Sequence, residues 1–201
     1  MDKRQVVVIH GGETFDTYEQ YLAMLESWEY DPYRAEYKDW KKRLPETLGE
    51  DFEVIAPSMP SKHNAKYKEW ELWFRKVVPF LRDGVVLVGH SLGGLFLAKY
   101  LNENELPVRV SATHLVAAPF GTTDTVTTLA DFDIPSILDK FEERGGRIRL
   151  YFSTDDPVVP FSELTRYQAA LPSAHTSIFA DRAHFNQEEF PEIVFEIANN
   201  V

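Results

Sequence analysis

Cysteine is absent from the 201-residue chain. This absence excludes disulfides, thiolate zinc sites, iron–sulfur clusters and cysteine nucleophiles, and it fits a reducing compartment. Long apolar runs are missing too. The first one covers only residues 6–9, short of the ~7–15 residues of a signal-peptide core, and none approaches the ~18 residues of a membrane span. We therefore expect a cytoplasmic protein without a membrane span.

Positive charge is scarce, because 21 Lys and Arg face 32 Asp and Glu, a formal net charge of −11. A phosphate backbone would be repelled by the average surface, which disfavours a nucleic-acid partner. Neither His-Glu-x-x-His nor Gly-x-Gly-x-x-Gly occurs, so we expect no metal and no nucleotide cofactor. Nothing in the sequence identifies a protein partner.

The length and a hydrophobic content of 44% indicate one globular domain over residues 1–201. Short apolar runs alternate with amphipathic segments, which predicts an α/β fold with a mostly parallel central sheet covered on both faces. The segment 119–133 is too short for a large lid. Strands are expected near 6–9, 52–57, 85–88, 109–117, 148–153 and 176–179. Helices are expected within 18–48, interrupted by prolines with a break near Asp31-Pro32, and near 66–81, 92–103, 136–144, 162–170 and 188–199.

A Gly-x-Ser-x-Gly motif, Gly89-His90-Ser91-Leu92-Gly93, lies between an apolar strand and a helix. A serine at such a sharp turn adopts a strained backbone, and its neighbours two positions away must be small. The turn raises the hydroxyl into a cleft above the sheet. The context favours Ser91 as a nucleophile over the alternative of a phosphate-binding or purely structural glycine turn.

A serine nucleophile needs a base held by a carboxylate. Past residue 156 the histidines are His175, at the start of a strand, and His184, in a loop after a strand. Catalytic groups gather in such loops, so we favour His184 as the base. Asp155 and Asp156 follow the preceding strand, and the residues themselves leave open which of the two orients the histidine.

An oxyanion hole needs two backbone N–H groups. Leu92, which follows the nucleophile, supplies one. The segment His10-Gly11-Gly12-Glu13 follows the first strand and is the natural source of the second. Gly12 is the expected donor because it lets the loop approach a substrate closely, with its neighbour Glu13 as the alternative.

Aromatic residues are concentrated in residues 18–40 and invite two interpretations. The rings could wall an acyl pocket, or they could simply pack the first helices on the sheet, which we favour. The residues concerned are Trp28, Tyr30, Tyr33, Tyr37 and Trp40.

These motifs resemble the α/β-hydrolase superfamily, and within it the small, nearly cap-less family typified by the retinoblastoma-binding serine hydrolase. The resemblance rests on the Ser91 motif, the segment 153–157 and the tripeptide Ala183-His184-Phe185. It implies a three-layer α/β-hydrolase sandwich with little or no cap. It also implies a triad of Ser91, His184 and the aspartate directly before proline, Asp156. Family members often have glycine where this chain has Ala183.

We therefore expect a carboxylesterase-like serine hydrolase that cleaves a small ester, thioester or amide through an acyl-enzyme. Its partner would be a small acyl substrate. Two alternatives stay open: a non-catalytic binding protein on a hydrolase scaffold, and an acyltransferase using the same triad.

Overall fold

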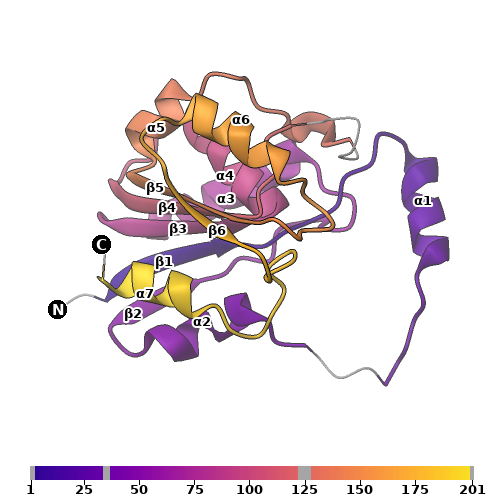
Figure 1. Ribbon diagram of the computed structural model, residues 1–201, viewed down its shortest axis with the longest axis horizontal. Coiled ribbons are helices and arrows are strands. Elements are labelled where there is room, and N and C mark those ends of the chain that lie inside the picture. The colour runs from indigo at the N-terminus through magenta and orange to yellow at the C-terminus, as the bar shows by residue number, and fades with distance from the viewer. Residues whose placement is uncertain (1–2, 34–36, 122–127, 200–201) are drawn as a thin grey trace.

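The computed structural model describes residues 3–33, 37–121 and 128–199, and a six-stranded sheet runs through them (Figure 1). The strand order is β2-β1-β3-β4-β5-β6 and every neighbouring pair is parallel. The strands are β1 (Arg4–Ile9), β2 (Phe52–Ile55), β3 (Val85–His90), β4 (Val110–Val116), β5 (Arg147–Ser153) and β6 (His175–Phe179). The expected parallel sheet is confirmed, and all six strands lie where the apolar runs predict them.

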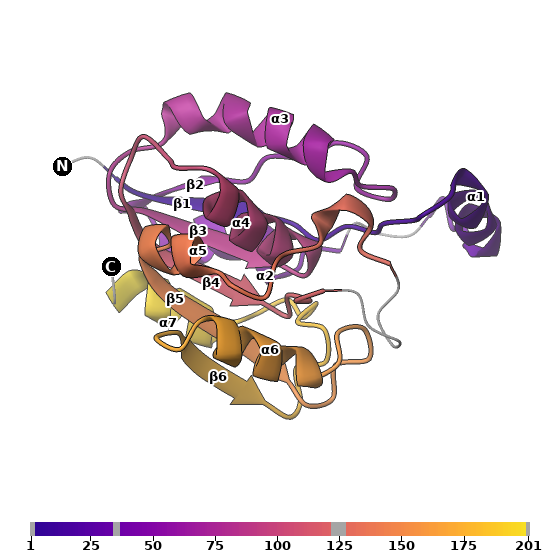
Figure 2. The same cartoon turned by 90° about the horizontal axis from the view of Figure 1, so that it is seen from above.

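Helices cover both faces of the sheet (Figures 1 and 2). One face carries α3 (Tyr67–Val77), α4 (Leu92–Glu103), α5 (Asp139–Arg144) and α6 (Ser162–Ala170), and the other carries α2 (Trp40–Leu48) and α7 (Pro191–Asn199). Two short 3-10 helices, Val78–Phe80 and Ala130–Phe132, follow α3 and precede α5. This three-layer arrangement confirms the expected fold class.

Successive side chains along each strand point to opposite faces of the sheet, so two hydrophobic cores form. In β3, Val85 and Leu87 pack into the core under α3 and α4, whereas Val86 and Val88 pack into the core under α2 and α7. All four side chains are fully buried. A strand buried on both faces needs a continuous apolar sequence, and the run 85–88 has one.

The region 18–48 differs from expectation in its details. The helix α1 (Tyr18–Ser27) ends well before Trp40, where α2 begins, so the break is longer than a proline turn. Pro45 lies inside α2 rather than interrupting it. The helix α1 projects from the body and has no buried residue (Figures 1 and 2).

The aromatic rings of this region mostly do not pack on the sheet, so that interpretation is wrong for them. Trp28, Tyr30 and Tyr33 are 46%, 88% and 92% exposed, whereas Trp40 is 2% exposed. Only Trp40 belongs to an element, α2, that covers the sheet. Tyr37 is exposed and lines a cavity described below.

Residues 122–127 of the expected short excursion lie outside the described part of the chain. In the part that is described, no helix combines the length and apolar character needed to cross a membrane.

Candidate active site

The turn from β3 into α4 holds Ser91 in a strained conformation, with φ 54° and ψ −126°. Two glycines make the turn sterically feasible. A Cβ on Gly89 would lie 2.5 Å from the Gly93 carbonyl oxygen, and one on Gly93 would lie 2.3 Å from the Ile9 carbonyl oxygen. Both contacts are closer than real Cβ atoms allow, so the motif needs glycine at these positions. This is the geometry of a nucleophile elbow.

Two backbone N–H groups, those of Leu92 and Gly12, belong to residues that line a cavity together with Ser91. The N–H of Leu92 and the N–H of Gly12 have no hydrogen-bond partner within the described residues. The Glu13 N–H, in contrast, donates to the Lys62 carbonyl at 2.8 Å. The geometry therefore favours Gly12 over Glu13 as a second oxyanion donor.

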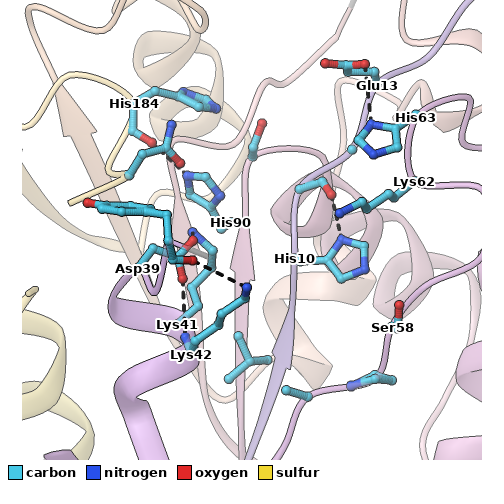
Figure 3. Close-up of a pocket in the computed structure, with 18 of the residues that line it drawn as sticks. His10, Glu13, Asp39, Lys41, Lys42, Ser58, Lys62, His63, His90 and His184 are labelled. Atoms are coloured by element: carbon cyan, nitrogen blue, oxygen red, sulfur yellow. Dashed lines mark hydrogen bonds and ion pairs between the residues drawn. The ribbon is translucent and has the colours of Figure 1, made fainter. Parts of the chain in front are cut away.

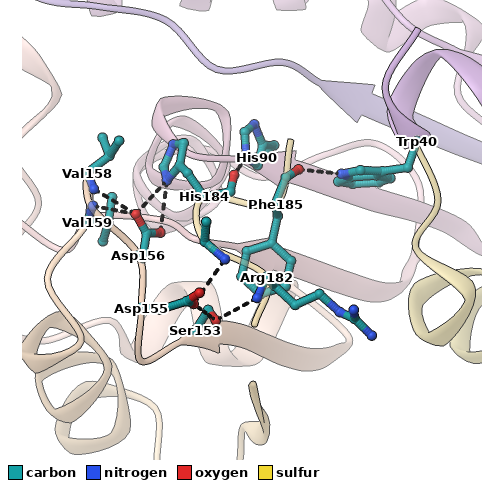
Figure 4. A network of polar contacts seen from close by, with 11 residues as sticks. Trp40, His90, Ser153, Asp155, Asp156, Val158, Val159, Arg182, His184 and Phe185 are labelled. Atoms are coloured by element: carbon teal, nitrogen blue, oxygen red, sulfur yellow. Dashed lines mark hydrogen bonds and ion pairs between the residues drawn. The ribbon is translucent and has the colours of Figure 1, made fainter. Parts of the chain in front are cut away.

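The His184 ring is held by a buried carboxylate (Figure 4). Its Nδ1 lies 2.9 Å and 3.1 Å from the two oxygens of Asp156. Asp156 Oδ1 also accepts the N–H groups of Val158 at 2.8 Å and Val159 at 3.0 Å. The Asp156 side chain is 2% exposed and that of His184 is 11% exposed. Because Nδ1 is engaged with the carboxylate, Nε2 is the nitrogen that remains for a reacting group.

Two long-range hydrogen bonds fix the backbone around His184 (Figure 4). His90 Nε2 donates to the His184 carbonyl at 2.8 Å, and Trp40 Nε1 donates to the Phe185 carbonyl at 2.7 Å. Burial lowers the pKa of His90 well below its usual value, and nearby Lys41 adds to the effect. His90 is therefore a neutral donor, since a carbonyl can only accept. The sequence favours a packing or hydrogen-bonding role for His90, which does not lie where the triad order places a base, and it gives no signal for the role of Trp40.

Asp155 points away from the His184 ring and braces the same loop from below (Figure 4). It accepts hydrogen bonds from the Ser153 hydroxyl and, at 3.0 Å, from the Ala183 N–H. The Ser153 hydroxyl oxygen in turn accepts the Arg182 N–H at 3.1 Å. The hydrogen bond from Ser153 lowers the pKa of Asp155. Asp155 therefore holds the loop, whereas Asp156 holds the His184 ring.

Ser91 and His184 line one cavity of ≈ 660 Å³, part of which is drawn in Figure 3. Within residues 3–33, 37–121 and 128–199, no hydrogen bond joins the Ser91 hydroxyl to the His184 ring. Such bonds are often long in ligand-free sites and tighten when substrate binds. Ser91 also borders a second cavity of ≈ 330 Å³, so it stands where the two meet.

His10 is fully engaged in its loop and has no free nitrogen for base chemistry. Its Nδ1 donates to the Gly11 carbonyl at 2.6 Å, and its Nε2 accepts the Met59 N–H at 2.9 Å. Burial lowers its pKa. His10 therefore holds the loop that carries Gly12 against the loop that carries Met59. His175 is exposed at the start of β6.

His63 and His114 both have polar neighbours. His63 Nδ1 lies 3.8 Å from the Glu13 carboxylate. His114 Nδ1 lies 2.9 Å from the hydroxyl of Tyr151 in the buried core. Among the described residues, no group of three or more histidines, cysteines and acidic residues could hold a metal ion.

Comparison with known proteins identifies the family. The pattern of the family described as "Serine hydrolase" matches residues 33–192. The chain belongs to this serine hydrolase family. That range includes the elbow, the paired aspartates and the His184 loop, whereas the loop that carries Gly12 precedes it. No match was found among curated proteins.

Solved structures confirm the α/β-hydrolase fold. The ydeN gene product from B. subtilis has a TM-score of 0.74 at 20% identity, covering 98% of each chain. A putative yden-like hydrolase from Pectobacterium atrosepticum has a TM-score of 0.69 at 14% identity, covering 98% of this chain and 90% of that one. Naproxen esterase from Bacillus subtilis has a TM-score of 0.63 at 12% identity, with coverage of 98% and 82%. The narrower resemblance to the retinoblastoma-binding hydrolase stays a prediction.

Proposed function

We propose that the protein is a serine esterase, with Ser91 as nucleophile, His184 as general base and Asp156 as the orienting carboxylate. The observation that carries the proposal is the pairing of a strained serine elbow with a histidine bound through Nδ1 to a buried carboxylate. Both groups open onto one cavity. A purely structural glycine turn would not need a histidine bound to a buried carboxylate in the same cavity.

The first half of the reaction makes an acyl-enzyme. His184 Nε2 takes the proton from the Ser91 hydroxyl while the oxygen attacks the carbonyl carbon of the substrate. The N–H groups of Leu92 and Gly12 stabilise the negative charge on the carbonyl oxygen. The carbon–oxygen bond to the leaving group then breaks, and His184 gives its proton to the departing alcohol. Asp156 stabilises the intervening imidazolium.

The second half of the reaction releases the acid. Water attacks the acyl-enzyme carbonyl, His184 Nε2 takes a proton from the water, and the proton returns to Ser91 as its oxygen leaves. The substrate, water, the three side chains and the two backbone N–H groups supply every atom that these steps use. An ester is the favoured substrate, because the carboxylesterase among the structural neighbours, naproxen esterase, shares the fold. Thioesters and small amides follow the same steps.

Turnover of p-nitrophenyl butyrate by wild type and by Ser91→Ala tests the proposal. Removal of the nucleophile is expected to lower kcat on the order of 10⁶-fold, as in other serine triads. A burst of nitrophenol equal to the enzyme concentration would report the acyl-enzyme. Ester turnover that Ser91→Ala leaves unchanged contradicts the proposal, and so does an absence of turnover in the folded wild type.

An acyltransferase would use the same residues and differ only in the acceptor. Adding a competing alcohol such as glycerol separates the two activities: hydrolysis yields the free acid, whereas transfer yields the new ester. We expect the free acid to dominate, because the cavity at Ser91 is open enough to admit water.

A further inference from the structure

The larger cavity is rich in cations for a chain with a net charge of −11. Lys41, Lys42 and Lys62 line it, against two carboxylates, Glu13 and Asp39. Lysines therefore outnumber carboxylates in this lining, whereas acidic residues outnumber basic ones in the whole molecule. Low-dielectric walls strengthen the resulting field inside such a cavity.

Both carboxylates are already engaged with neighbours. Asp39 Oδ2 lies 2.7 Å from Lys41 Nζ, and Asp39 Oδ1 accepts the Lys42 N–H at 3.3 Å at the start of α2. The Glu13 carboxylate lies 3.8 Å from His63 Nδ1. Asp39 thus pairs with the Lys41 ammonium and caps a helix, while the Lys42 ammonium donates to the Tyr37 carbonyl at 3.4 Å.

Lys62 lies beside the loop that carries Gly12. Its carbonyl accepts the Glu13 N–H at 2.8 Å, and a Cβ on Gly12 would lie 2.8 Å from the same oxygen. Lys62 is thus a direct neighbour of the proposed oxyanion donor. It forms no ion pair within the described residues. Figure 3 shows its side chain reaching from between His10 and His63 toward the middle of the cavity.

Lys41 adds a buried charge to the wall. Its side chain is 11% exposed, and Asp39 is its ion-pair partner. An ammonium group has three donors, so one carboxylate does not use its full capacity. Burial lowers the pKa of Lys41, while Asp39 raises it. A second anion in the cavity would compensate the burial of this ammonium.

The smaller cavity has a different character. Apart from the residues that it shares with the larger cavity, its lining includes the apolar side chains of Phe15, Met24, Leu92, Pro119, Leu129 and Val159. Ser91, Gly12, Glu13 and Val158 line both cavities. A substrate carbonyl at Ser91 would therefore have an apolar space on one side and a cationic space on the other.

We propose that the substrate is an ester or thioester with a carboxylate or phosphate group that binds among Lys41, Lys42 and Lys62, and an apolar group that fills the smaller cavity. This inference rests on the proposed esterase function and specifies its substrate class. The anionic group can belong to the acyl part or to the alcohol part of the ester, and the experiment separates these two cases.

Two pairs of esters, each matched in size, test the proposal. The p-nitrophenyl monoester of adipic acid against p-nitrophenyl hexanoate places the carboxylate on the acyl side. The ester 4-acetoxybenzoate against 4-acetoxybenzamide places it on the alcohol side. In at least one pair we expect kcat/KM to be about tenfold higher for the anion, because charge-assisted contacts form in a partly buried site. The advantage should shrink between about 0.05 M and about 0.5 M salt.

A charge substitution identifies the source of the preference. Lys62→Gln should lower the anion-to-neutral ratio of kcat/KM about tenfold, and Lys62→Glu should lower it further. Lys76→Gln is the matched control, since Lys76 is an exposed lysine of α3 outside both cavities. Its ratio should equal that of wild type. A ratio of one in both ester pairs overturns the proposal, and so do equal effects of Lys62→Gln and Lys76→Gln.

Binding to Ser91→Ala provides a readout that does not depend on turnover. Calorimetric titration with the members of both ester pairs should show tighter binding of the anion in at least one pair. Equal binding in both pairs overturns the inference even where the esterase function holds. Conversely, hydrolysis that persists in Ser91→Ala contradicts the esterase function and leaves the anion preference to be judged by the titration.

Discussion

His90 donates a hydrogen bond from Nε2 to the backbone carbonyl of His184 across 94 positions of sequence. His90 directly precedes Ser91, and His184 lies in the loop after β6. The bond therefore ties the loop of the proposed base to the turn of the proposed nucleophile. The two rings lie 5.0 Å apart between centroids. The relative position of base and nucleophile thus depends on a buried neutral histidine.

Replacing His90 tests this positioning role. His90→Phe removes the donor and leaves a buried carbonyl without a partner, so we expect kcat to fall about tenfold or more with a smaller change in KM. His90→Gln can present an amide N–H near the position of Nε2 and should recover part of the loss. Steady-state kinetics with p-nitrophenyl butyrate measure both effects. Equal kcat values for the two variants, at equal melting temperature, would contradict the role.

The two adjacent aspartates provide a matched pair of substitutions. Asp156→Asn presents an amide to His184 Nδ1 and disturbs the tautomer, so kcat/KM should fall by about 10³–10⁴. Asp155→Asn keeps an acceptor oxygen for the Ala183 N–H, and its kcat/KM should fall less than about tenfold. The ratio of kcat/KM values checks the assignment. A larger loss in Asp155→Asn than in Asp156→Asn would reverse it.

Gly12→Ala tests the second oxyanion donor. A Cβ there would lie 2.8 Å from the Lys62 carbonyl oxygen and 3.1 Å from Trp70, so the loop must move. Displacing one oxyanion N–H should lower kcat by about 10²–10³. Gly121→Ala is the control, because its Cβ would meet only the flexible end of Arg166. If Gly12→Ala retains the kcat of this control, the donor lies elsewhere.

Buried His114 predicts a loss of stability in acid. Burial lowers the pKa of His114 from 6.5 to about 3, and Arg149 and Arg147 add to the effect. Below pH 6.5, His114 binds a proton in the unfolded chain but not in the folded protein. The free energy of unfolding therefore falls as the pH falls from 6.5 toward 3. Between pH 7 and pH 4 this one group accounts for about 3 kcal/mol.

His114→Asn is the matching variant for this prediction. The Asn amide can occupy the position of Nδ1 beside the hydroxyl of Tyr151, and it does not titrate. Urea unfolding at pH 7 and pH 4 should show a smaller loss of free energy in the variant than in wild type. Part of the loss should remain, because burial also lowers the pKa of His90. Identical losses in wild type and variant would rule out His114 as a source of acid sensitivity.

The sequence predicts most of the fold, because apolar runs and turn residues are local signals. The helices α4 and α6 occupy the expected residues 92–103 and 162–170. The sequence does not predict that α1 projects, since nothing local distinguishes a helix that covers a sheet from one that leaves it.

The proposed site could be located from sequence only in part. The elbow has a local signature, since Ser91 needs Gly89 and Gly93 as neighbours. No local signature distinguishes Asp155 from Asp156 as the partner of His184. The two residues differ only in the direction that the turn gives each side chain, and the sequence does not show that direction. The hydrogen-bonding role of Trp40 could not be predicted, since its bond to the Phe185 carbonyl spans 145 positions. Ala183 has φ 44°, a backbone conformation that glycine adopts without the strain of a Cβ.

Covalent labelling of Ser91 tests the central claim most directly. The purified protein is treated with a fluorophosphonate at neutral pH, and the modified residue is located by peptide mass spectrometry. We expect one adduct, on Ser91, that forms much more slowly in Asp156→Asn and is absent in Ser91→Ala. A folded wild-type protein that stays unlabelled, or that carries the adduct on another residue, would contradict the assignment of Ser91 as an activated nucleophile.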